Sequence, residues 1–171
     1  YPAFIENWCQ NVDLRGDDDR VWWLGHAALL LRLNQRYILI DPVLSARASP
    51  LPFAGPERKT PAPLCVTQLP HLDFVLISHN HYDHLDRPTV KRITRRFPAA
   101  QFIVPLGMGE WCRKRGVRRV KELDWWQSVA VSGLTFTAVL ASPSRMRLIR
   151  RRTPLLWFSA HVRTLTPLSR F

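Results

Sequence analysis

One segment constrains this chain more than any other: an apolar run over residues 74–78 that leads directly into a cluster of metal-binding residue types. The run is typical of a buried strand, which places the cluster on the loop at the end of that strand. A loop allows several side chains to converge on one point, whereas alternate residues of a strand face opposite sides. A lone histidine is more often structural, but three imidazoles and a carboxylate in H-x-H-x-D-H order predict a metal site. The predicted ligands are His79, His81, Asp83 and His84.

The spacing of these residues suits a hydrolytic zinc site, in which the metal lowers the pKa of a water molecule. His79 and His81 are two residues apart and can share one ion, while Asp83 and His84 can serve a second ion nearby. We also expect Asp83 to orient the attacking water, which makes it the predicted catalytic residue. Because this loop supplies at most two ligands per ion, the remaining ligands must come from distant residues.

Hydrophobic patterning predicts a layered α/β architecture in which one sheet packs against another. A helix should begin at Asp86-Arg87-Pro88 and run to Phe97, and Gly116 should end a second helix over residues 108–115. Residues 45–70 are rich in proline and predict a long irregular loop. Strands are expected over residues 21–24, 27–33, 37–40, 73–78, 101–104, 120–123, 128–131 and 134–139.

Charge and composition narrow the possible functions. The formal charge of +12 suggests a nucleic-acid binder, but residues 125–171 contain seven Arg and no acidic residue, so much of the basicity belongs to the tail. We find no glycine-rich phosphate loop and no dense alternation of aromatic and basic residues, and so expect no specific nucleic-acid partner. No apolar run is long enough to cross a bilayer, and the three cysteines suggest no disulfide framework. These features favour a cytoplasmic protein, with peripheral attachment to a membrane as the alternative.

The ordered motifs resemble one enzyme family over about residues 21–137. The segment Ser78-His79-Asn80-His81-Tyr82-Asp83-His84-Leu85-Asp86 is the metal signature of the metallo-β-lactamase fold. The segments that narrow the match are Trp23-Leu24-Gly25-His26-Ala27, Asp41-Pro42, Arg47-Ala48-Ser49-Pro50, Gly55-Pro56-Glu57-Arg58, Val104-Pro105-Leu106-Gly107 and Glu122-Leu123-Asp124-Trp125-Trp126. Together they resemble the N-acyl-phosphatidylethanolamine-hydrolysing phospholipase D family and its bacterial relatives.

This resemblance implies a four-layer αβ/βα sandwich that holds two zinc ions at its edge. It also implies a phosphodiesterase that cleaves a phospholipid-like substrate into an N-acylethanolamine and phosphatidic acid. Asp41, at a strand end, would support the ligands without binding metal itself. For His26 we expect no ligand role; a ring hydrogen-bonded to backbone is the expected environment.

The family pattern breaks in the tail, residues 138–171. Pro143 stands where the family has a third histidine ligand, and proline cannot bind a metal. We therefore expect a single partial domain over residues 1–171, the N-terminal half of the sandwich, with a tail that is partly out of frame; natural divergence is the alternative. His161 lies away from the register expected for a substitute ligand.

The missing ligand predicts weak or absent activity in this chain. One alternative is a catalytically inactive fragment, and another is a nuclease or other hydrolase of the same fold. The arginine-rich tail also suggests attraction to anionic membrane surfaces.

Overall fold

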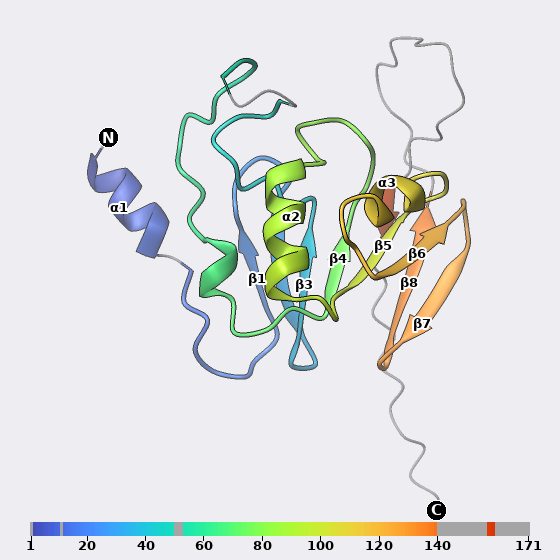
Figure 1. Cartoon of the computed structure of the whole chain (residues 1–171). Helices are drawn as coiled ribbons and strands as arrows, with labels where there is room; N and C mark the ends of the chain where they lie inside the picture. Colours follow the sequence, from blue (N-terminus) through green and yellow to red (C-terminus); the bar gives the residue numbers. More distant parts are fainter. Residues whose placement is uncertain (1, 11, 50–52, 140–156, 160–171) are drawn as a thin grey trace, which may run out of the picture.

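The computed structural model describes residues 2–10, 12–49, 53–139 and 157–159. These residues form a six-stranded sheet and a three-stranded sheet, with helices on the face of the larger sheet that lies away from the smaller one (Figure 1). The expected layered α/β architecture, with sheet packed against sheet, is confirmed. That residues 1–171 form one partial domain stays a prediction.

The helices and strands lie close to the expected ranges. The helices are α1 (Pro2–Gln10), α2 (Arg87–Arg96) and α3 (Gly109–Arg113), with a 3₁₀ turn at Val66–Gln68. The larger sheet holds β1 (Arg20–Trp23), β2 (Leu29–Leu33), β3 (Arg36–Ile40), β4 (Phe74–Leu76), β5 (Gln101–Pro105) and β6 (Arg119–Leu123). The smaller sheet holds β7 (Ser128–Val131), β8 (Leu134–Val139) and β9 (Trp157–Ser159).

Several details differ from the sequence-based expectation. Helix α1 and strand β9 were not expected. The strand expected over residues 73–78 is shorter, since β4 spans Phe74–Leu76. The strand expected from residue 27 begins at Leu29, because residues 24–28 close a tight turn in which the Leu24 amide donates to the Ala28 carbonyl at 2.8 Å. The loop over residues 45–70 contains the 3₁₀ turn and an isolated bridge between Arg47 and Glu57.

Strand direction decides where the functional loops meet. Strands β3, β4, β5 and β6 are parallel neighbours in that order, so their carboxyl ends share one edge of the sheet. Strand β1 pairs antiparallel with β2, and β2 pairs antiparallel with β3, so β1 runs in the same direction as β3. The loops that follow β1, β3, β4, β5 and β6 therefore all leave the sheet at this edge, which we call the carboxyl edge.

Alternation along the strands builds two separate cores. Phe74, Leu76 and Ile103 face the smaller sheet, and Phe74 meets Phe136 of β8 at a ring-centroid distance of 4.8 Å. Val75 and Phe102 face the other way, into a cluster that includes α2.

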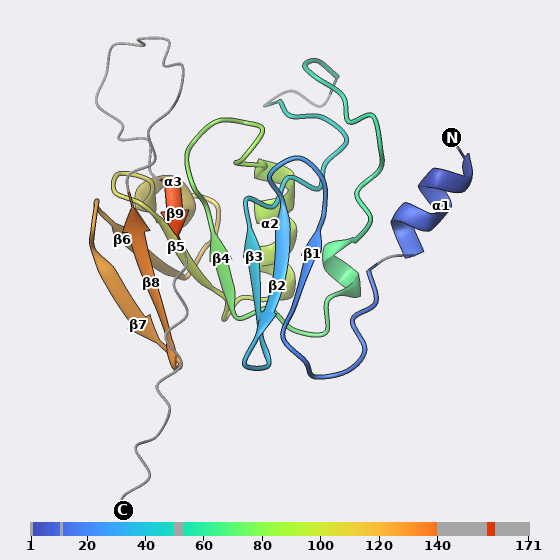
Figure 2. The same ribbon diagram turned by 180° about the vertical axis from the view of Figure 1, so that it is seen from behind.

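The smaller sheet covers only part of the larger one. Seen from behind, β7 and β8 lie beside the β5–β6 end, and β1 to β3 form the opposite end (Figure 2). Val21 and Trp23 of β1 alternate with the buried Trp22 and are more than half exposed. In the described residues no helix is long and apolar enough to span a membrane.

Candidate metal centre

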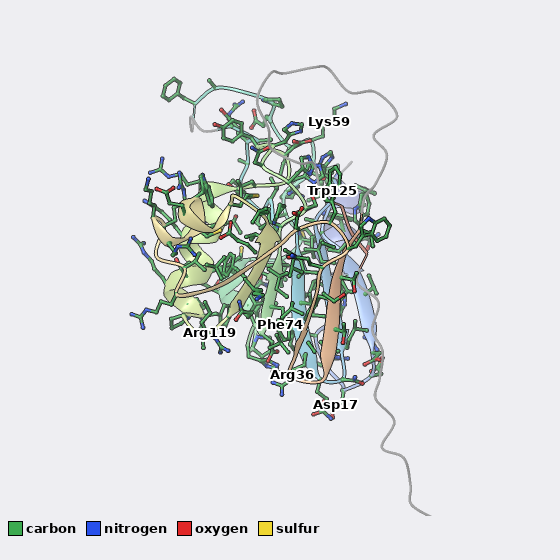
Figure 3. The ribbon with its side chains drawn as sticks, turned by 90° about the vertical axis from the view of Figure 1, so that its right-hand side faces the viewer. Asp17, Arg36, Lys59, Phe74, Arg119 and Trp125 are labelled. Atoms are coloured by element: carbon green, nitrogen blue, oxygen red, sulfur yellow. The ribbon has the colours of Figure 1, made fainter. Side chains whose placement is uncertain are left out.

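The predicted ligand loop leaves the carboxyl edge directly after β4. Asp41 follows β3 at the same edge. Figure 3 shows the two ends of the sheet: Arg36, at the start of β3, lies at the end opposite Lys59 and Trp125. Parallel pairing of β3 and β4 thus brings Asp41 next to a loop that lies almost 40 residues further along the chain.

Asp41 is a buried carboxylate that organises this loop. Its side chain accepts hydrogen bonds from the backbone amide of Ser78 at 2.7 Å and from the Ser78 hydroxyl at 2.6 Å. It also lies 2.8 Å from Nδ1 of His84. Only 4% of Asp41 is exposed, so these contacts replace the water that an ionised carboxylate would otherwise bind. The contacts agree with a supporting role for Asp41, which stays a prediction.

The two most enclosed histidines each have one ring nitrogen engaged by the protein. Nδ1 of His84 is held by Asp41, and Nδ1 of His79 lies 2.8 Å from the Ser78 hydroxyl. A hydrogen bond at one imidazole nitrogen fixes the tautomer and orients the other nitrogen for a metal. Nε2 is the nitrogen that each ring can offer to an ion.

The four predicted ligands lie close together on the loop. The ring centroids of His79 and His84 are 4.0 Å apart, and those of His79 and His81 are 4.7 Å apart. The Asp83 carboxylate lies 3.7 Å from Nε2 of His84. The four side chains are therefore neighbours, but of these four only Asp83 and His84 belong to a group in the described residues whose ligand atoms all lie within 4.8 Å of one another. The assignment of the four as ligands stays a prediction.

The electrostatic environment keeps the imidazole and the carboxylate in their metal-binding forms. Burial, assisted by the neighbouring His84 and His81, lowers the pKa of His79 to about 4, so the ring is neutral at pH 7. Burial by itself would raise the pKa of Asp83, but the charge on His84 and the hydrogen bond from His26 lower it overall. A neutral imidazole and an ionised carboxylate bind a metal without first losing a proton.

His26 is the residue whose environment the sequence reasoning predicted wrongly. Its ring bonds a side chain rather than backbone: Nε2 lies 3.1 Å from Oδ2 of Asp83. The His26 and His84 rings meet edge-on at 5.4 Å. Ligand atoms of His26, Asp83 and His84 all lie within 4.8 Å of one another. The available signal was strand direction, because a residue just after β1 must lie at the same edge as the loop after β4.

Two other residues singled out from the sequence, Pro143 and His161, fall outside the described residues. The described residues contain one further histidine, His71. His71 precedes β4 at the opposite edge of the sheet, where it lies 3.3 Å from Asp73.

The donor set fits a divalent transition metal. Imidazole nitrogen and carboxylate oxygen at one locus are ligands for zinc and for iron. The fixed tautomers of His79 and His84 and the lowered pKa of Asp83 match what such an ion requires.

Comparison with known proteins agrees with the superfamily that the sequence motifs resemble. A family profile described as "Beta-lactamase superfamily domain" matches residues 36–167. An uncharacterized protein of Mycobacterium tuberculosis is 44% identical over 149 residues, which cover 85% of this chain and 40% of that protein. N-acyl-phosphatidylethanolamine-hydrolyzing phospholipase D 1 of Caenorhabditis elegans is 45% identical over 111 residues, which cover 62% of this chain and 31% of that enzyme.

Among solved structures, CmlA, a diiron β-hydroxylase from Streptomyces venezuelae, aligns with a TM-score of 0.56 and 29% identity, covering 75% of this chain and 25% of CmlA. The chain spans about 40% of the length of the mycobacterial relative and less of the nematode enzyme.

Proposed function

This chain belongs to the beta-lactamase superfamily, and from that premise we propose that it is a zinc-dependent phosphodiesterase of the phospholipase D type. Its substrates would be lipids that resemble N-acyl-phosphatidylethanolamine. Water would attack phosphorus and break the bond to the ethanolamine oxygen, releasing phosphatidic acid and an N-acylethanolamine. The observation that carries the proposal is the packing of His79 and Asp83 against His84, beside the buried Asp41.

In this proposal each residue of the loop has a defined task. His79 and His81 would hold one ion, and Asp83 and His84 would hold a second. A divalent ion in such a site would acidify a water molecule and so supply a nucleophile at neutral pH. Asp83 would also orient that water; because its Oδ2 is engaged by His26, Oδ1 is the oxygen available for this task. Asp41 keeps the ring of His84 in place through Nδ1.

Exposed aromatic side chains at the carboxyl edge support a lipid substrate. Tyr82 lies on the ligand loop, and Trp125 and Trp126 follow β6, so all three leave the sheet at the edge that carries the metal cluster. Tyr82 and Trp126 are more than half exposed. Tyrosine and tryptophan favour the boundary between water and lipid because their rings are amphipathic. The nematode relative, named for this lipid, supports the same substrate class.

The test is hydrolysis by the full chain. Purified protein supplied with zinc is incubated with vesicles that contain N-acyl-phosphatidylethanolamine, and both products are measured by mass spectrometry. We expect a low rate, because Pro143 stands where the family has a histidine ligand, with phosphatidic acid and N-acylethanolamine formed in equal amounts. His81→Ala should reduce the rate by more than about 100-fold, since even residues that only support a ligand change affinity or activity by 10–100-fold.

The same assay tests the alternatives. Absence of product with zinc, iron or manganese would reject the proposal and leave the catalytically inactive chain. Degradation of single-stranded DNA without lipid hydrolysis would instead support a nuclease. Elemental analysis of the purified protein distinguishes zinc from iron, the metal in the name of the CmlA structure.

A further inference from the structure

The loop after β1 contributes to the metal centre in a way that the sequence did not suggest. We propose that His26 is a protein ligand of the ion held by Asp83 and His84, so that this site is shared by loops 57 residues apart in the chain. The inference rests on the metal binding in the proposed function and does not depend on lipid hydrolysis.

The distances suit direct ligation. Around a tetrahedral ion with bonds of 2.0–2.1 Å, neighbouring ligand atoms are separated by ~3.4 Å. Oδ2 of Asp83 lies 3.1 Å from Nε2 of His26 and 3.7 Å from Nε2 of His84, values on either side of that separation. The three side chains thus offer a carboxylate oxygen and two imidazole nitrogens to one point.

The ligand loop by itself offers too few side chains for this ion, and His26 would provide a third donor. The ligand loop supplies only Asp83 and His84 to this ion, and Nδ1 of His84 is already engaged by Asp41. A catalytic zinc site has three protein ligands and one open position. His26 would complete that number and leave the fourth position for solvent or substrate.

The backbone at His26 is held in place on several sides. The indole nitrogen of Trp23 donates to the His26 carbonyl at 2.8 Å. Arg58 donates to the carbonyl of Leu24 at 2.7 Å and also to the carbonyl of Val43, which follows β3. His26 itself adopts a left-handed backbone conformation with φ of 49°. Such conformations persist where the surroundings enforce them, often at functional sites.

The competing interpretation is that His26 only donates a hydrogen bond to Asp83. The chain provides a matched comparison at the opposite edge of the sheet, where His71 lies 3.3 Å from the carboxylate of Asp73 and is similarly exposed. In the described part of the chain, no third metal-binding side chain completes a group around that pair. His71→Ala is therefore a control that removes a histidine–carboxylate contact away from the metal centre, together with the contacts of His71 to the Gln35 carbonyl and the Tyr37 ring.

The experiment measures metal binding by the full chain and by His26→Ala, His26→Gln and His71→Ala. Titration calorimetry and elemental analysis after dialysis give the affinity and number of zinc ions, and cobalt absorption reports the coordination geometry. We expect both His26 variants to lower the affinity for one of the zinc ions by more than about 100-fold. This loss exceeds the range usual for a residue that only supports a ligand. Both should also change the cobalt spectrum, whereas His71→Ala should match the wild type.

The His26→Gln variant distinguishes metal ligation from a simple hydrogen bond to Asp83, because the glutamine amide can still donate to Asp83 but is a poor zinc ligand. Wild-type affinity and spectrum in His26→Gln would overturn the inference, as would a wild-type chain that binds no zinc. Circular dichroism of the metal-free variants shows that they fold. A wild-type chain that binds zinc, loses an ion on His26 substitution and hydrolyses no lipid would support the inference while the proposed function fails.

Discussion

At the scale of single residues, two buried carboxylates form a matched pair. Comparing them distinguishes an effect on zinc binding from an effect on the stability of the fold. Asp41 accepts hydrogen bonds from Ser78 and contacts His84. Asp86 accepts hydrogen bonds from the Ser45 amide and the Thr89 hydroxyl and contacts no predicted ligand in the described hydrogen bonds. Both are about 95% buried.

We expect Asp41→Asn and Asp86→Asn each to lower the free energy of unfolding by about 2–3 kcal/mol, because each loses charge-assisted hydrogen bonds. Only Asp41→Asn should also weaken zinc binding, by roughly 10–100-fold. Urea unfolding of the metal-free proteins and zinc titration measure the two effects. Equal losses of zinc affinity in both variants would contradict a specific role for Asp41.

The three cysteines should differ sharply in reactivity. Burial raises the pKa of Cys112 to about 12, whereas Cys9 and Cys65 are exposed. Because the thiolate is the reactive form, Cys112 stays protonated at pH 8. We expect iodoacetamide to modify two cysteines in the folded chain and three in urea, as counted by mass spectrometry. A third adduct that forms equally fast in the folded protein would refute this.

At the scale of elements, the start of α3 depends on a strand that follows it in the sequence. Oε1 of Glu122 on β6 accepts hydrogen bonds from the amides of Gly107 and Gly109, at 2.7 and 2.9 Å. A Cβ atom at Gly109 would lie 2.2 Å from the other oxygen of this carboxylate. A side chain at Gly109 would therefore displace the Glu122 carboxylate from its hydrogen bonds at the start of α3.

We expect Gly109→Ala to destabilise the fold by about 1–3 kcal/mol, the usual cost of overpacking. In a Glu122→Ala background the same substitution should cost little, because the obstructing side chain is gone. Urea unfolding of the four proteins in this double-mutant cycle measures the coupling. Additive effects of the two substitutions would show that Glu122 is not the obstacle.

Elements were predictable from sequence where their signal is local. The buried run at residues 74–78, the proline at the start of α2 and the alternation in β8 each placed an element correctly. Helix α1 was not predicted because the contacts that hold it come from residues distant in sequence. Trp8 packs edge-on against Trp23, and its indole nitrogen donates to the Pro61 carbonyl. His26 was assigned the wrong environment for the same reason, since its partner depends on strand order rather than on neighbouring residues.

At the scale of the whole molecule, we expect the formal charge of +12 and the exposed aromatic residues at the carboxyl edge to favour binding to anionic membranes together. We expect the protein to bind anionic vesicles more tightly than neutral ones. Each basic side chain near the membrane surface should contribute about 1 kcal/mol to the binding free energy. Added salt should reduce the difference by screening, and Trp125→Ala with Trp126→Ala should weaken binding to both kinds of vesicle. Co-sedimentation measures each case. Equal binding to neutral and anionic vesicles would count against the electrostatic contribution.

The hairpin between β2 and β3 turns at Asn34 and Gln35, both with left-handed backbone conformations, at the end of the sheet away from the metal cluster. At 3.3 Å per strand residue, this turn lies roughly 20 Å from Asp41. A nitroxide attached there would be remote from the chemistry yet within range of a paramagnetic ion such as manganese. Electron spin resonance would then measure how far each ion lies from this end of the sheet.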